Sequence, residues 1–124
     1  MEMLTAELPF ASNAPRLARG VVAEHFGHRP RCAELLLCVS ELVTNAVLHA
    51  RSAPRLRIAG RGRYVRVEVD DDDPTLPRRP AYDGGAITGR GLRILDRVAA
   101  GWGARAHAEG KTVWCVIDLD GDPP

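Results

Sequence analysis

Lysine is almost absent from this 124-residue chain, in which Lys111 is the only one and arginine supplies the rest of the positive charge. The formal net charge is +1, so no large electrostatic force draws the chain toward nucleic acid, and we expect no direct nucleic-acid binding. A local group of arginines stands out on two predicted strands, where alternation favours a solvated face over a binding patch. Its members are Arg55, Arg57, Arg61, Arg63 and Arg66.

Paired cysteines and long apolar runs are missing as well. Cys32, Cys38 and Cys115 are odd in number and lack metal-ligand spacing, which favours reduced, packed thiols over a disulfide framework or a zinc site. No apolar run approaches the roughly 18 residues that cross a bilayer. The N-terminus carries Glu2 and no basic region before an apolar stretch, so it does not resemble a signal peptide. We therefore expect a cytoplasmic protein without a membrane partner.

The remaining composition is that of a globular domain. Hydrophobic residues make up 45% of the chain and charged residues 27%, which is usual for soluble proteins. A chain of 124 residues can bury one core but has no room for a second domain of comparable size. We expect a single domain over residues 1–124.

Two kinds of hydrophobic periodicity predict a mixture of helices and strands. Alternation predicts strands at 4–10, 56–60, 64–69, 102–108 and 112–119, the last four paired as two hairpins with turns at 61–63 and 109–111. A helical period predicts helices at about 13–26, 31–49 and 89–100, the first capped by Ser12 or Asn13. Asp70 to Thr88 follows neither pattern and is predicted to be a long loop, which in a small domain is usually functional.

The stretch ELVTNAVLHA, residues 41–50, carries the first candidate site. Its spacing puts Glu41, Asn45 and His49 on one face of the second predicted helix. Taken alone, this pattern is more typical of a solvated helix face. It also suits catalysis, because an amide oxygen can bind Mg²⁺ without adding charge beside phosphates, and a carboxylate one turn away can accept a proton.

Two further stretches have matching chemistry. In VEVDDDDP four acids follow a strand, and Asp71, chosen by its spacing after Val69, could accept a hydrogen bond from a purine amino group. A solvated acidic turn is the alternative interpretation. In TGRGLRI, residues 88–94, small residues lead into a helix whose free amides could hold phosphate, and a plain N-cap at Thr88 is the alternative there.

Together and in this order, ELVTNAVLHA, VEVDDDDPTLP, TGRGLRILDRVA and GKTVW resemble the ATP-binding domain of the GHKL ATPases, which include gyrase, heat-shock chaperones, sensor histidine kinases and mismatch-repair proteins. The resemblance covers about residues 8–119 and is strongest to the anti-sigma-factor serine/threonine kinase branch. It implies an α+β fold, a two-layer sandwich in which helices cover one face of a mixed, mostly antiparallel sheet. This is the Bergerat, or histidine kinase-like, fold, with ATP between the central helix, the loop and the second glycine motif.

The resemblance also implies roles for particular residues. Glu41 takes the position of the general base and Asn45 that of the Mg²⁺ ligand, while Asp71 takes the adenine-binding position and Thr112 that of a hydroxyl supporting it. His49 is assigned no chemistry beyond packing or a helix-end role. The residues implied to contact nucleotide are Asn45, Asp71, Asp73, Thr88, Gly89, Arg90, Gly91, Leu92 and Thr112.

Two departures from the family pattern bear on phosphoryl transfer more than on nucleotide binding. The acidic box of the family continues Asp-x-Gly-x-Gly, whereas this chain has Asp73 and Thr75 at the glycine positions. Some members carry a basic residue before the Ser/Thr-Gly pair, where this chain has Ile87. Arg90, or Arg78 and Arg79 from the loop, are the candidate replacements.

The function implied by the resemblance is that of an ATP- and Mg²⁺-dependent serine/threonine protein kinase. Such a kinase sequesters a sigma factor and phosphorylates an anti-anti-sigma protein of the STAS type, and so switches between partners. The main alternative is a non-catalytic module that binds ATP and sequesters a protein partner. A histidine kinase fragment is disfavoured because 124 residues leave no room for phosphoacceptor helices. The identities of the partners and the formation of a homodimer stay open.

Overall fold

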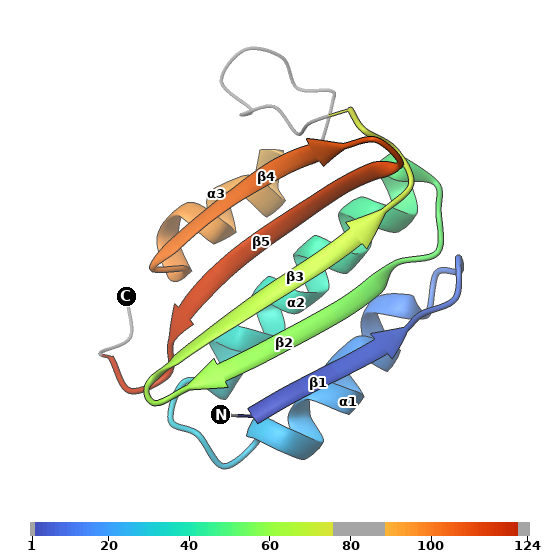
Figure 1. The fold of residues 1–124 in the computed structure, drawn as a ribbon. Coiled ribbons are helices and arrows are strands. Elements are labelled where there is room, and N and C mark those ends of the chain that lie inside the picture. The colour runs from blue at the N-terminus through green and yellow to red at the C-terminus, as the bar shows by residue number, and fades with distance from the viewer. Residues whose placement is uncertain (1, 76–88, 122–124) are drawn as a thin grey trace.

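The computed structural model describes residues 2–75 and 89–121, and the fold is described for these residues. Five strands form one sheet in the order β1-β2-β3-β5-β4 (Figure 1). Every pairing in this sheet is antiparallel, so the mixed character that we expected is not found among the described strands. The strands are β1 (Glu2–Glu7), β2 (Arg55–Arg61), β3 (Tyr64–Asp71), β4 (Gly101–His107) and β5 (Gly110–Asp118).

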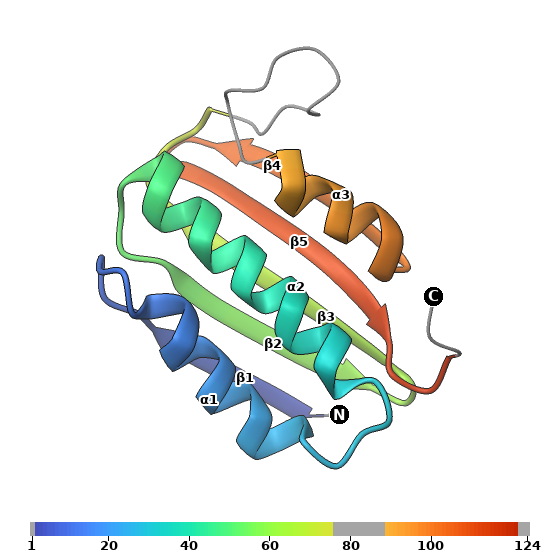
Figure 2. The ribbon, with the colours of Figure 1, turned by 180° about the vertical axis from the view of Figure 1, so that it is seen from behind.

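Three α-helices cover one face of this sheet and leave the other face open (Figure 2). They are α1 (Ala14–Phe26), α2 (Cys32–Asn45) and α3 (Gly89–Val98), and α2 continues into a π-helical turn, η1 (Ala46–Ala50). The predicted α+β sandwich is thereby confirmed. Pro15 lies in the first turn of α1, and Asn13, one of the two expected caps, is at the N-cap but makes no side-chain capping hydrogen bond.

Alternation along β3 decides which side chains enter the core. Val65, Val67 and Val69 are buried against the helices, while Arg66 between them is exposed, as the sequence predicts. The turn from β2 into β3 needs a residue in the left-handed region, and Gly62 supplies it with a φ of 62°. Register across this hairpin pairs Arg61 with Tyr64, so the sequence pattern placed the turn correctly.

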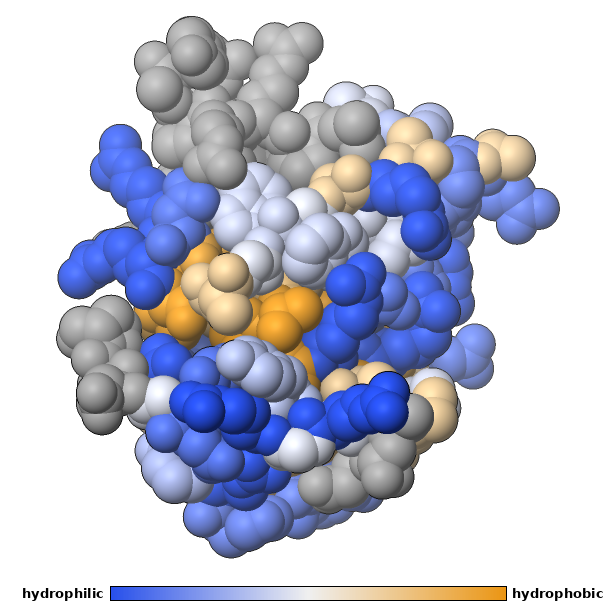
Figure 3. All heavy atoms as spheres, turned by 60° about the vertical axis from the view of Figure 1, so that its left-hand side comes forward, coloured by the Kyte–Doolittle hydropathy of each residue, from blue (hydrophilic) through white to orange (hydrophobic). Residues whose placement is uncertain are grey.

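Helix α2 is the centre of the core. It packs against α1, α3, β3 and β5, and its buried side chains include Leu35, Val39, Leu42 and Val43. All three cysteines are free and buried, which confirms the prediction of packed thiols. From one side of the molecule, apolar residues show as a central patch enclosed by hydrophilic ones (Figure 3).

Cys32–Ala50, the segment made of α2 and η1, is by length and composition also apolar enough to cross a membrane, with 19 residues and a mean hydropathy of 1.4. The expectation that no segment reaches this length was therefore wrong. The core helix of a globular domain passes the same test, and the buried stripe of α2 faces the sheet and both other helices. We interpret the segment as a core helix.

On the open face of the sheet, Arg55, Arg57 and Arg66 of the arginine cluster are solvated side chains that form ion pairs. Arg57 forms ion pairs with Asp70 at 3.0 Å and with Glu68 at 3.2 Å. Arg66 binds Glu68 and lies over the indole ring of Trp114, 4.4 Å from its centroid. These pairings agree with the favoured interpretation of a solvated face.

Candidate functional site

The predicted site residues within the described part of the chain gather mainly at one end of the molecule. There the end of α2 and η1 lie beside the end of β3 and the start of β5 (Figures 1 and 2). Contacts of α2 with β3 and β5, and of η1 with β3, hold these elements together. The polar side chains of these elements decide what the site can bind.

Asp71, the last residue of β3, is held in a buried position with 2% exposure. Its Oδ1 accepts a hydrogen bond from the Asp73 N–H at 2.9 Å and another from Lys111 Nζ at 3.1 Å. Lys111 Nζ also lies 3.0 Å from Asp71 Oδ2. Burial raises the pKa of Asp71, and the Asp73 N–H and the Lys111 cation oppose that rise. The carboxyl group therefore depends on both partners for its charge.

Lys111 contacts Asp71, and the sequence analysis did not single it out as a candidate. It lies on β5 directly across from Asp71 in the strand register, and only 4% of it is exposed. Besides Asp71, Nζ donates to the carbonyl oxygen of Asp73 at 3.0 Å. As the only lysine of the chain, Lys111 is conspicuous in the sequence, but the hydrophobic pattern places it in the turn between the last two predicted strands. The turn consists of residues 108 and 109, and β5 already begins at Gly110.

Thr112 lies on the opposite face of the sheet from Asp71, because successive side chains of β5 point to opposite faces. Its hydroxyl donates to Asp70 Oδ1 and lies 3.4 Å from His107 Nε2. The structure thus brings Lys111, rather than Thr112, to Asp71. The predicted support of adenine by Thr112 stays a prediction, and it would have to act without direct contact to Asp71.

Asn45 presents an oxygen with no partner. The residue is 6% exposed, and its Oδ1 is fully buried without a hydrogen bond to any described residue. Buried polar atoms almost always have partners, so this amide oxygen is available to a ligand, although Arg31 Nε, Glu34 Oε2 and His49 Nε2 are buried without partners too. A hard cation such as Mg²⁺ prefers oxygen ligands, and Asn45 therefore fits the metal position that the resemblance implied.

Glu41 and His49 flank Asn45 on the same helical segment. Glu41 is partly exposed and lies one turn earlier. His49 belongs to η1, and its Nε2 is likewise buried without a hydrogen bond to any described residue. Burial lowers the pKa of His49, and the charge of Lys111 adds to that effect. A π-turn often marks a functional site, and here it begins immediately after Asn45.

The acidic loop after β3 is organised by its own side chains. Asp73 Oδ1 accepts the Thr75 N–H at 2.9 Å, and this bond, with the Thr75 hydroxyl, lowers the pKa of Asp73. The carboxylate of Asp73 is thus engaged within the loop. Arg78, Arg79, Ile87 and Thr88 lie outside the described residues.

The second glycine motif coincides with the first turn of α3, which begins at Gly89 as predicted. Gly89, Arg90, Gly91 and Leu92 are described here by their backbone alone. A helix N-terminus offers free N–H groups and a positive dipole end to phosphate. The phosphate-binding role of this turn remains a prediction.

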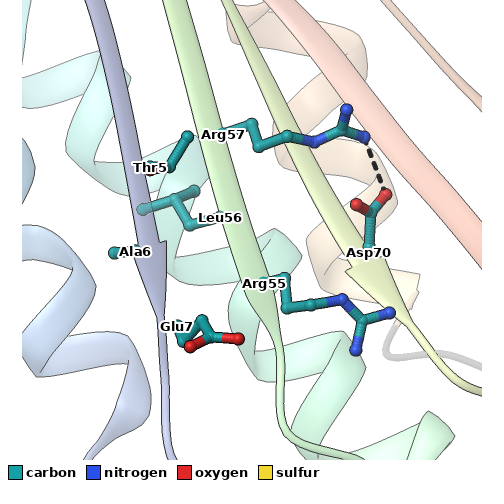
Figure 4. Close-up of a pocket in the computed structure, with 7 residues that line it drawn as sticks. All are labelled: Thr5, Ala6, Glu7, Arg55, Leu56, Arg57 and Asp70. Atoms are coloured by element: carbon teal, nitrogen blue, oxygen red, sulfur yellow. Dashed lines mark hydrogen bonds and ion pairs between the residues drawn. The ribbon is translucent and has the colours of Figure 1, made fainter.

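A hollow of about 410 Å³ lies elsewhere, on the open face of the sheet (Figure 4). Arg55, Arg57 and Asp70 line it together with residues of β1. Arg57 donates a hydrogen bond to Asp70 Oδ1 at 3.0 Å, and both side chains line the hollow. None of the predicted nucleotide-contacting residues lines this hollow, so it does not coincide with the candidate site.

Comparison with known proteins identifies one family of ATPase domains. The family model described as the histidine kinase-like ATPase domain matches residues 4–117. The uncharacterized protein SCO4941 of Streptomyces coelicolor is 33% identical over 94 residues, which cover 69% of this chain and 85% of that protein.

Two solved structures share the fold. One contains the RsbU and RsbW domains of Rv1364c from Mycobacterium tuberculosis, with a TM-score of 0.74 and 20% identity over 99% of this chain. The other is the histidine kinase domain of the blue-light activated histidine kinase EL346 from Erythrobacter litoralis, with a TM-score of 0.53 and 26% identity over 71% of this chain. The match spans 34% of the first solved chain and 44% of the second.

Proposed function

Because the chain belongs to the histidine kinase-like ATPase domain family, we propose that it binds ATP with Mg²⁺ and transfers phosphate to a serine or threonine of a protein partner. The partners would be a sigma factor and an anti-anti-sigma protein of the STAS type, met in the cytoplasm without nucleic acid or membrane. The motif resemblance to anti-sigma-factor kinases supports this choice. Fold similarity to a chain with an RsbW domain is in keeping with it.

The observation that carries the proposal is the orphaned oxygen of Asn45. This buried Oδ1 lies one turn from the carboxylate of Glu41, on a helix that contacts the strand ending in Asp71. An amide ligand for the metal, a proton acceptor and a base-recognition carboxylate are the groups that transfer from ATP requires. All three come from elements that meet at the same end of the fold.

Each residue has a separate task in this proposal. Asn45 would hold Mg²⁺, which when bound neutralises charge on the phosphates. Glu41 would accept the proton of the attacking hydroxyl. Asp71 would accept a hydrogen bond from the purine 6-amino group, and the N–H groups of the first turn of α3 would hold phosphate.

A non-catalytic ATP-binding module is the second candidate function. It is favoured by Asp73 and Thr75, which occupy positions where the kinase pattern has glycines. The Asp73 N–H donates to Asp71 and the Thr75 N–H donates to Asp73, and these two bonds fix the start of the loop. Calorimetry with ATP, with and without Mg²⁺, tests the premise that both candidates share. Transfer of radiolabelled phosphate to candidate STAS-type proteins then distinguishes the kinase from the module.

Asp71→Asn is expected to weaken ATP binding about tenfold or more, because loss of a charge-assisted hydrogen bond costs about 1.5 to 3 kcal/mol. Calorimetry at saturating Mg²⁺ measures the effect, after circular dichroism has shown that the variant is folded. The wild-type chain should also bind ATP more tightly than GTP, since the guanine carbonyl would face the carboxylate as acceptor against acceptor.

Asp70→Asn is the matched control for this prediction. Asp70 lies next to Asp71 but on the open face, bound to Arg57 and Thr112. We expect this variant to bind ATP as the wild type does. If Asp71→Asn also leaves the dissociation constant unchanged, Asp71 is not part of the site.

A further inference from the structure

The buried ammonium group of Lys111 is held between two residues. Its Nζ donates one hydrogen bond to Oδ1 of Asp71 at 3.1 Å and another to the carbonyl oxygen of Asp73 at 3.0 Å, and it forms an ion pair with Oδ2 of Asp71 at 3.0 Å. An ammonium group has three donors and no acceptor. Because these contacts fix Nζ between Asp71 and Asp73, we expect Lys111 to affect a ligand mainly through Asp71 and the loop.

A buried carboxylate needs such a partner in order to stay charged. Asp71 is almost completely buried, and among the described residues Lys111 is the one cation within ion-pairing distance of it. Asp73 bears a like charge that disfavours ionisation of Asp71. The charge of Lys111 also acts on Asp73, whose pKa it lowers, and on His49 of η1, whose pKa it lowers as well. Burial raises the pKa of Asp71, and the groups that favour its ionised form are the Asp73 N–H and Lys111.

Lys111 also fixes the first residues of the acidic loop. Its bond to the Asp73 carbonyl and the bond from the Asp73 N–H to Asp71 hold the same residue from two sides. The next hydrogen bond runs from the Thr75 N–H to Asp73. Where the family pattern has glycines, this chain shapes the loop with a cation and side-chain acceptors.

We propose that Lys111 is a positioning residue of the base subsite, the place beside Asp71 where the purine would bind. Lys111 keeps Asp71 as a pure hydrogen-bond acceptor, and the subsite therefore selects 6-amino over 6-oxo purines. The inference rests on the proposed binding of ATP. A charged carboxylate accepts hydrogen bonds only, and it repels the oxygen of a 6-oxo purine. A protonated carboxyl can donate to that oxygen and loses the distinction.

Substitution Lys111→Met tests the inference through a ratio of affinities. Calorimetry with Mg²⁺ gives the dissociation constants of ATP and of inosine triphosphate, which carries a 6-oxo group in place of the amino group. The wild type should prefer ATP by about tenfold or more. The variant should bind the two nucleotides with similar affinity, whereas a purely structural loss would weaken both equally and keep the ratio.

Arg63→Met, in the turn between β2 and β3, provides the control. Arg63 forms an exposed ion pair with Asp118 at the far end of β5 and should leave the ratio unchanged. Retention of the preference for ATP by Lys111→Met would overturn the inference. The inference would also be overturned if Lys111→Met bound ATP more tightly than the wild type, because Lys111 would then hinder binding of the adenine ring.

A second measurement needs no variant. NMR can follow the carboxyl ¹³C resonance of Asp71 in the wild-type chain while the pH is varied. We expect the resonance to report an ionised carboxyl group at about pH 7. A protonated Asp71 at neutral pH would overturn the inference. Failure of the wild type to bind ATP would overturn the proposed function and the inference with it, whereas a retained ratio in the variant overturns the inference alone.

Discussion

Glu41→Gln is expected to leave ATP bound while phosphoryl transfer to the cognate protein falls by about 10² to 10⁴, the usual range for loss of a general base. Glutamine keeps the shape and polarity of the side chain but cannot take up the proton. Calorimetry measures the binding, and radiolabel transfer under single-turnover conditions measures the chemistry. The exposed Glu24 on α1 offers a control, since Glu24→Gln should change neither.

Asn45→Ala gives the contrasting result, because it removes the orphaned oxygen rather than the base. Mg²⁺-ATP affinity and transfer should fall together. If Glu41→Gln and Asn45→Ala lose nucleotide affinity equally, Glu41 serves the metal or the fold, and the kinase mechanism must be abandoned. If the wild type binds ATP but transfers phosphate to no candidate partner, the non-catalytic module is favoured.

Gly110→Ala is expected to lower stability strongly and to displace the Asp71–Lys111 pair. A Cβ at this position would lie 1.9 Å from the backbone oxygen of Asp71 and 2.9 Å from the Cα of Asp72. Overpacking costs about 1 to 3 kcal/mol and more where backbone must move, against about 5 to 15 kcal/mol for a whole domain. Thermal unfolding followed by circular dichroism should show a fall in Tm of several degrees.

The same substitution at Gly20 should act in the opposite direction. Gly20 is exposed in the middle of α1, and a Cβ there meets nothing within 4 Å. Replacing a helical glycine by alanine stabilises by about 0.5 to 1 kcal/mol. If Gly110→Ala proves as stable as the wild type, β3 and β5 can move apart at this position without loss of stability.

The fold could be predicted because its strongest signals are local. Val65, Val67 and Val69 alternate with polar residues, and Gly62 marks the turn before them, so the hairpin follows from neighbours in sequence. The central helix follows from its apolar stripe. Its π-turn carries no such signal, because it changes the local winding without changing the hydrophobic pattern.

The placement of the candidate site residues was predictable in part. The sequence places Asp71 at the end of a strand and Asn45 on the central helix, and the structure agrees and buries both residues. The sequence pattern places Lys111 in the turn at 109–111, whereas β5 begins at Gly110 and pairs Lys111 with Asp71. The role given to Thr112 came from the resemblance, and Thr112 points to the other face of the sheet. The pairing of β3 with β5 is non-local, so no sequence pattern around Lys111 reveals what lies across from it.

The sheet order has a consequence for the folding pathway. β3 and β5 are neighbours, yet Asp71 and Lys111 are 40 positions apart in the chain. Hairpins β2–β3 and β4–β5 close over short turns and should form early, whereas their union must wait for a long loop to close. Asp71 belongs to one hairpin and Lys111 to the other. The proposed base subsite would therefore be assembled in the step that joins the two hairpins, and a chain arrested before that step would contain both residues without the contact between them.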